Sequence, residues 1–150
     1  MAGGPRPLNN TQGILNDHQH LDGLLRDLRV VSGWNPALFL EPSVRARLLR
    51  DLGALHARLV SHFAIEERGS YLAEIGQRRP AARPKLEKLH AEHRALLDQV
   101  EGVLNLCNAS PLEGKFDRFD FQRNLLALLN ALHEHERQET LLIQEVFRAP

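Results

Sequence analysis

Apolar residues recur along this chain at intervals of three and four positions, the spacing that places them on one face of an α-helix. Such stripes run through four stretches, at about residues 11–31, 42–75, 84–108 and 116–147. Proline, glycine and asparagine separate these stretches, and the sequence has no strand-like alternation of apolar and polar residues. Because the connections are short, the sequence predicts an all-α protein with an up-down-up-down antiparallel four-helix bundle.

Proline and glycine indicate where the predicted helices begin, bend and end. Pro42 fits the first turn of the second helix, where a missing N–H breaks no hydrogen bond. The Gly69-Ser70 pair inside that helix predicts a kink. Residues 1–10, which are rich in glycine, proline and asparagine, are expected to form a flexible N-terminal segment. Residues 11–150 would then form a single bundle domain of ordinary size.

Histidine and glutamate interrupt the apolar stripes without leaving them. His62 and Glu66 continue the three-and-four spacing of the leucines in the second stretch, and His135 and Glu139 do so in the fourth. The first and third stretches each place one histidine on the stripe, so the candidate metal ligands are His18, His62, Glu66, His93, His135 and Glu139. Buried imidazoles and carboxylates are costly without partners, and a bound divalent metal would remove that cost.

The candidate ligands form a pattern that occurs twice, a single histidine followed further along by a His-x-x-x-Glu pair. In both halves an acidic residue precedes the single histidine, as Asp17-His18 and Glu92-His93. The repeat concerns these residues rather than the bulk of the sequence. Residues four apart lie about one turn, roughly 6 Å, along one helix face, so each His-x-x-x-Glu pair can reach one centre.

The donor types favour iron as the metal. Imidazole combined with carboxylate suits iron, although zinc and manganese remain chemically open. A structural zinc site is often built with thiolates, and Cys107 is the one cysteine of the chain. We therefore expect two iron ions bridged by the two glutamates. The geometric hypothesis assigns His18 and His62 to one ion, and His93 and His135 to the other.

At these residues the sequence resembles the hemerythrin-like, or HHE cation-binding, family. The likeness extends from about Thr11 to Phe147, and His62-Phe-Ala-Ile-Glu66-Glu is its most specific part. The resemblance implies a four-helix bundle that holds a non-haem di-iron centre, with carboxylate bridges and an oxo bridge as a further option. It also implies metal ligation by the six histidines and glutamates named above.

The chain departs from the oxygen-carrying hemerythrins, which have different spacings on the third and fourth helices. Here those positions read His90-x-x-His93 and His135-x-x-x-Glu139. The sequence looks closer to four-histidine, two-glutamate members of the family, which include oxygen or redox sensors and iron-centre repair proteins. The position of His90 favours a role that supports a ligand or the fold without binding the metal, and direct binding as a fifth histidine ligand stays open. The off-stripe histidines are expected to be exposed or partly exposed: His20, His56 and His133.

Composition excludes several classes of partner. The chain has 19 basic and 19 acidic residues, so it lacks the positive charge expected of a protein that binds nucleic acid or an anionic membrane. No apolar run approaches the roughly 18 residues that would span a bilayer, and the first residues contain no apolar signal segment. A single cysteine agrees with a reducing compartment. These features predict a cytoplasmic protein.

The sequence thus predicts a non-haem di-iron protein that binds or senses dioxygen or a related small oxidant. One alternative is an iron-centre repair factor or a factor in the response to nitric oxide or peroxide. Others are a ferritin-like di-iron oxidase and a metal-free bundle that binds partner helices. No separate cluster of acid, base and nucleophile is visible, which leaves enzymatic turnover open. A sensor of this size would signal through a separate partner protein.

Overall fold

The computed structural model describes residues 5–68 and 71–148, and within them the chain is helical and contains no strand. Two short 3₁₀ helices, η1 (Pro36–Leu40) and η2 (Pro80–Ala82), accompany the α-helices. The α-helices of this described part are α1 (Pro5–Ser32), α2 (Pro42–Arg68), α3 (Tyr71–Arg78), α4 (Arg83–Ala91), α5 (His93–Asn108) and α6 (Arg118–Arg148). The all-helical class predicted from the sequence is confirmed.

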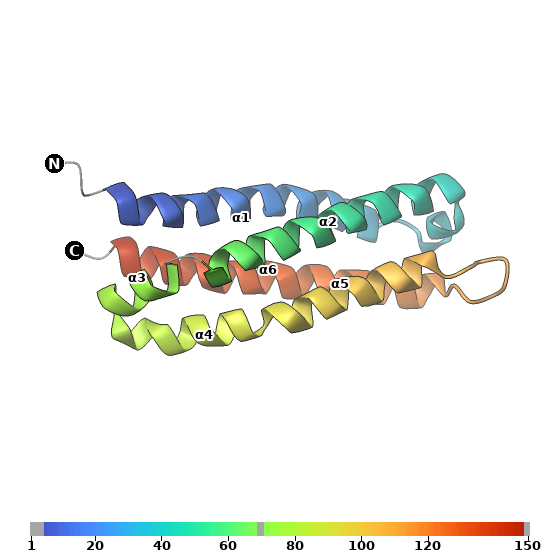
Figure 1. Ribbon diagram of the computed structural model, residues 1–150. Helices are drawn as coiled ribbons and strands as arrows, with labels where there is room; N and C mark the ends of the chain where they lie inside the picture. The colour runs from blue at the N-terminus through green and yellow to red at the C-terminus, as the bar shows by residue number, and fades with distance from the viewer. Residues whose placement is uncertain (1–4, 69–70, 149–150) are drawn as a thin grey trace.

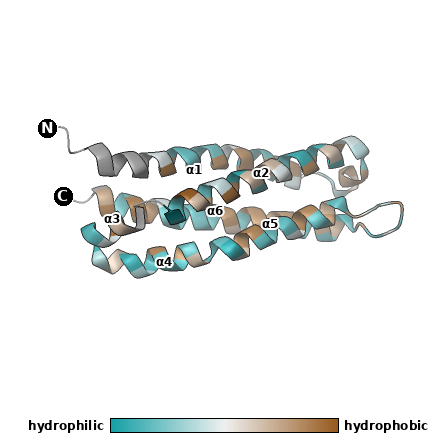
Figure 2. Cartoon of the chain, in the orientation of Figure 1, coloured by the Kyte–Doolittle hydropathy of each residue, from teal (hydrophilic) through white to brown (hydrophobic). Residues whose placement is uncertain are grey.

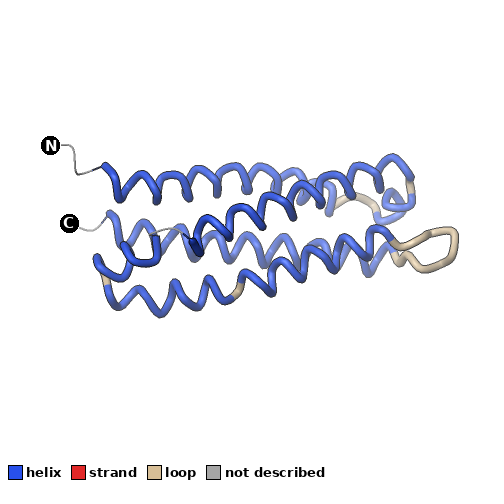
Figure 3. Tube along the Cα trace, viewed as in Figure 1, coloured by secondary structure: helices blue, strands red, loops and turns tan. Residues whose placement is uncertain are grey.

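The long helices lie side by side along one axis (Figure 1). The chain runs along α1, turns at η1, and returns along α2; it then passes through α3 and η2, runs back along α4 and α5, and returns along α6. Consecutive long segments therefore alternate in direction. The connections gather at the two ends of the molecule, apart from a break between α4 and α5 (Figure 3).

The structure divides the chain more finely than the four predicted helices, so the simple four-helix description is not confirmed in its exact form. The second predicted stretch comprises α2 and α3, and the kink expected at Gly69-Ser70 lies outside the described residues. The third stretch is divided into α4 and α5. Helix α1 begins at Pro5 rather than near Thr11.

Glu92 marks the break between α4 and α5. Its backbone N–H bonds to the carbonyl of Leu89 at 3.2 Å, three residues back, as in a 3₁₀ turn. The regular spacing resumes when the N–H of Leu96 bonds to the carbonyl of Glu92 at 3.0 Å. A tightened turn therefore lies between His90 and His93, two of the histidines considered above.

Amphipathic helices build the core, and Figure 2 shows hydrophilic and hydrophobic residues alternating along them. The larger apolar cluster contains Leu52, Leu55, Leu125 and Leu128, all fully buried. A smaller cluster near the other end contains Ile75, Leu86 and Ile143. Along the long segments the candidate ligands fall between these two clusters in sequence, except that His62 directly precedes Phe63 of the larger cluster. The described part of the chain has no helix that is both long and apolar enough to cross a membrane.

Candidate metal centre

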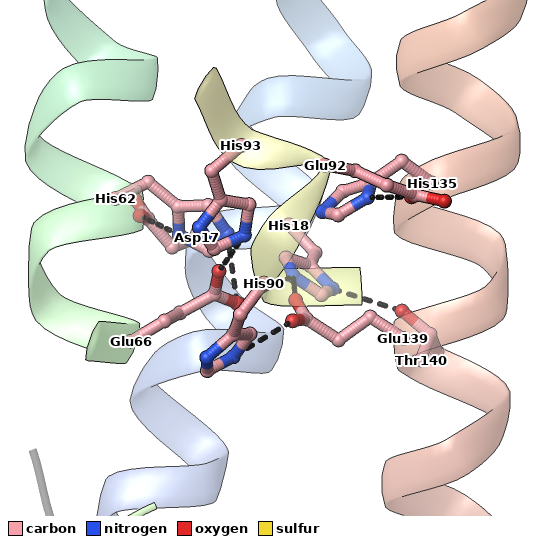
Figure 4. A network of polar contacts seen from close by, with 10 residues as sticks. All are labelled: Asp17, His18, His62, Glu66, His90, Glu92, His93, His135, Glu139 and Thr140. Carbon is pink, nitrogen blue, oxygen red and sulfur yellow. Dashed lines mark hydrogen bonds and ion pairs between the residues drawn. The ribbon is translucent and has the colours of Figure 1, made fainter. Parts of the chain in front are cut away.

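The six predicted ligands lie in a buried polar layer between the two apolar clusters (Figure 4). The four histidines are 2–4% exposed, and both glutamates are completely buried. Each of them continues the apolar stripe of its helix, which explains why the sequence turns them inward. The layer draws on four segments of the chain: His18 from α1, His62 and Glu66 from α2, His93 from α5, and His135 and Glu139 from α6.

Glu66 lies at the centre of the layer and reaches histidines from three helices. Its Oε2 atom is 3.3 Å from His62 Nε2 and 3.7 Å from His18 Nε2. Its Oε1 atom is 3.2 Å from His93 Nε2. Glu139 approaches from α6, and its Oε1 atom is 2.8 Å from His18 Nε2. The two carboxylates therefore connect histidines that belong to different parts of the bundle.

Two acidic residues hold the outer nitrogens of two histidines in equivalent ways. Asp17 Oδ2 lies 2.6 Å from His62 Nδ1, and Glu92 Oε1 lies 2.9 Å from His135 Nδ1. When a carboxylate accepts a hydrogen bond from Nδ1–H, the other ring nitrogen, Nε2, is left unprotonated and available as a donor to metal. In both cases Nε2 faces the interior of the bundle.

The other two histidines have the same orientation. His18 Nδ1 hydrogen-bonds with Thr140 Oγ1 at 2.9 Å, while its Nε2 atom faces Glu139. His93 Nδ1 is on the side of Glu67, with an oxygen at 3.8 Å, and its Nε2 atom faces Glu66. All four histidines thus present Nε2 to the interior of the bundle and Nδ1 to its outer side.

Two overlapping sets of donor atoms are close enough to hold a metal ion, with every atom within 4.8 Å of the others in its set. Both sets share Glu66 and Glu139. The first adds His18 and His62, and the second adds His90 and His93. The structure therefore brings five of the six predicted ligands together and adds His90. It leaves His135 outside these sets, with its ring bonded to Glu92.

Comparison with known families gives a single clear result. The sequence model of the hemerythrin HHE cation binding domain matches residues 9–146. The chain belongs to this family. No curated protein and no solved structure gave a significant match. This membership confirms the resemblance seen in the sequence. The His/Glu cluster of this HHE-family chain agrees with the description of the family as a cation-binding domain.

The two central carboxylates of the HHE domain have opposite proton affinities. Burial raises the pKa of Glu66 well above its ordinary value, and the adjacent Glu139 carboxylate raises it further. Burial also opposes ionisation of Glu139, but the adjacent Glu66 carboxyl and the hydrogen bond with His18 lower its pKa to about 2. In the metal-free protein Glu66 therefore accepts a proton more readily than Glu139. A divalent cation between the two carboxylates would take the place of that proton.

The histidines of the second donor set are poor bases. Burial lowers the pKa of His93 to about 3, and the neighbouring rings of His135 and His90 contribute. Burial also lowers the pKa of His90. Neutral imidazole is the form that binds metal, so both rings are in the right state at neutral pH. By contrast, although burial lowers the pKa of His18, hydrogen bonds with Glu139 and Glu66 raise it overall.

Unsatisfied atoms show that this donor set fits a metal. Within the described residues, several buried atoms of the layer have no hydrogen bond: both oxygens of Glu66, Oε2 of Glu139, and Nε2 of His93 and His135. Buried polar atoms are normally paired, and these are carboxylate oxygens and imidazole nitrogens aimed at a common space. Ligation of iron, manganese or zinc would satisfy them.

The outer hydrogen-bond partners received no role in the sequence interpretation. Asp17 and Glu92 occur in the repeated pattern next to His18 and His93, yet each bonds to a histidine on another helix. Their repeated position was the signal that could have identified them. Thr140 follows Glu139 directly and carries no such signal, because its role depends on how α1 packs against α6.

The remaining histidines and the cysteine lie outside the centre. His20 and His133 are exposed, and His56 is partly exposed, with Nε2 3.3 Å from a Glu101 oxygen. Cys107 is buried in the larger apolar cluster. The placements of the three histidines agree with the expectations from their positions relative to the stripes.

A groove lies between α4–α5 and α6 and reaches one of the six predicted ligands, His135. Its volume is about 690 Å³, and its walls include the apolar side chains of Leu89, Leu96 and Leu142. Glu92 and His135 also line the groove. Glu92, at the break between α4 and α5, therefore forms its hydrogen bond with His135 at this groove.

Proposed function

We propose that this HHE-family chain binds two non-haem iron ions in the bundle and uses them to bind or sense dioxygen or a related small oxidant. One observation carries the proposal: four histidines direct Nε2 inward around two fully buried carboxylates whose oxygens lack sufficient hydrogen bonds. A folded protein without a cation gains nothing from this arrangement, because each buried unsatisfied group lowers its stability.

The ligand assignment follows the two donor sets. His18 and His62 hold one ion, and Glu66 and Glu139 are shared by both ions. The second ion takes His93, together with His135 as predicted from the sequence. His90, which the structure brings into the second set, is the competing ligand at that position. Substituting His90 and His135 separately and counting the retained ions distinguishes the two assignments.

The protein residues around the ions have defined tasks in this proposal. Asp17 and Glu92 fix the tautomer and orientation of the histidines that they bond. The apolar clusters on both sides limit water in the layer, which strengthens the electrostatic interactions within it. Bound iron would supply reversible oxidation and coordination positions for a small exogenous ligand. That ligand would arrive through the groove between α5 and α6.

We also propose that the protein is cytoplasmic, as the sequence predicts. A cytoplasmic protein of this kind would respond to dioxygen, nitric oxide or peroxide that diffuses into the cell. A sensing role would require a separate protein that recognises the altered bundle. Cell-based measurements can test the response to these molecules, and binding measurements can test the recognition by a separate protein.

Metal analysis of freshly purified protein, combined with optical spectra, tests this function. Near two irons per chain are expected, with ferric absorption bands that disappear on anaerobic reduction and return in air. His62→Ala should lose most of the iron, whereas His20→Ala, which removes an exposed histidine, should retain it. Zinc as the native metal, or no metal after anaerobic iron loading, would contradict the redox proposal.

A further inference from the structure

A buried carboxyl group outside the His/Glu centre lacks an evident counter-charge. Glu136 on α6 is only 7% exposed, and neither of its oxygens receives a hydrogen bond within the described part of the chain. It lies between two predicted ligands in sequence, but it faces α1 rather than the centre of the bundle. A buried carboxyl without hydrogen bonds requires either a proton or a cation.

Glu136 lines a cavity of about 220 Å³ between α1 and α6. Asp22 from α1 lines the same cavity. Burial, together with the adjacent Asp22 carboxyl, raises the pKa of Glu136 to about 10. His133, three residues before Glu136 and therefore on the same side of α6, also lines it. Asp22 and His133 are exposed, so the cavity opens to solvent on their side.

This cavity is separate from the main centre, although the two are adjacent. His18 divides them: its Nδ1 atom bonds with Thr140 Oγ1, and both residues line the cavity. The Nε2 atom of the same ring faces Glu139 in the main centre. Glu136 shares this cavity with His18 and Thr140, and it belongs to neither donor set of the main centre.

We propose that Glu136 and Asp22, with His133 at the cavity mouth, form a second cation site that takes a divalent metal such as Mn²⁺ or Fe²⁺. Two carboxylates, one imidazole and water are the donors that these ions accept. Arg137 also lines the cavity, but its guanidinium is engaged by Glu134 through Nε at 3.1 Å and Nη2 at 3.0 Å. The site should be weaker than the main centre, since it has fewer fixed protein donors.

Equilibrium binding of Mn²⁺ alone to the full chain tests this site, with free Mn²⁺ measured by electron paramagnetic resonance. The wild-type chain should bind one weak Mn²⁺ ion that Glu136→Gln abolishes, and Asp22→Asn should weaken it about tenfold or more. Glu145→Gln, which removes an exposed carboxylate from the same helix, should leave it unchanged. His62→Ala should remove binding at the main centre and keep the weak ion.

Two results would overturn the second site. If the wild-type and Glu136→Gln isotherms coincide, Glu136 holds only a proton. If Glu136→Gln instead removes ions from the main centre along with the weak one, Glu136 acts on that centre and forms no separate site. The His62→Ala chain separates this proposal from the di-iron function, because retention of its weak ion does not depend on the main centre.

Discussion

Asp17 on α1 and Glu92 at the break between α4 and α5 each hydrogen-bond to a histidine on another helix. We expect Asp17→Asn and Glu92→Gln each to weaken iron retention by about 10–100-fold, because the ring loses the partner that fixes its tautomer and position. Competition with a chelator measures the effect. Asp27→Asn, an exposed change on α1, should retain iron like the wild type. Unchanged retention in both outer variants would show that these hydrogen bonds do not support the centre.

Phe63 packs against the rings of His93 and His135. Its ring stacks on His93 with the centroids 3.8 Å apart, and it meets His135 edge-on at 5.7 Å. It is 3% exposed, so Phe63→Ala should lower the unfolding free energy by about 3–5 kcal/mol. Urea denaturation of the metal-free chain provides the measurement. The control Ile65→Ala, at a position that is 54% exposed, should change it by no more than about 0.5 kcal/mol.

At the scale of helices, Arg45 joins the start of α2 to the end of α5. Its guanidinium donates to the carbonyl of Cys107 and, at 2.6 Å, to that of Ala109, and it lies over the ring of Phe116. A cation at a helix C-terminus satisfies carbonyls that lack helical partners and interacts favourably with the helix dipole.

Arg45→Met keeps most of the side-chain length and removes the charge. We expect it to lower the unfolding free energy by about 1.5–3 kcal/mol, the range for hydrogen bonds from a charged donor. Arg50→Met, at an Arg side chain that is 74% exposed, serves as the control and should have little effect in the same denaturation experiment. If the two variants are equally stable, the end of α5 does not depend on this contact.

The helical elements and the ligand stripes were predictable because both depend on local spacing. His62 and Glu66 continue a leucine stripe, so their burial follows from helix geometry alone. The break at Glu92 was not predictable, since neither this residue nor its neighbours His90 and His93 oppose helix formation strongly. His90 enters the second donor set through that break and through packing against α6. These are tertiary effects that a single sequence does not contain.

For the molecule as a whole, bound metal would link the four long segments, so protonation and folding would be coupled. Metal ligation requires neutral imidazole, and loss of metal at low pH removes the stabilisation that metal binding gives to the folded state. The metal-free chain should have its own pH dependence, which arises from groups whose pKa differs between the folded and unfolded states.

His93 gives the clearest contribution of this kind. Burial, together with His135 and His90, lowers its folded pKa from 6.5 to about 3. Below about pH 6.5 the His93 ring is therefore protonated in the unfolded chain but stays neutral in the folded chain. As a result, His93 lowers the unfolding free energy as pH falls from about 6.5 towards 3. One such group changes the unfolding free energy by at most about 1.4 kcal/mol per pH unit.

His93→Gln isolates that contribution from opposing groups such as His18, whose raised pKa favours the folded state at low pH. The variant lacks the titrating ring, so the deficit in its unfolding free energy relative to wild type should shrink between pH 7 and pH 5. Urea denaturation of both metal-free chains at several pH values measures the difference. A deficit that stays constant across this range would mean that the folded protein protonates His93 as readily as the unfolded chain does. In that case the ring would have to be hydrated, and the dry polar layer on which the proposed metal centre depends would not exist around it.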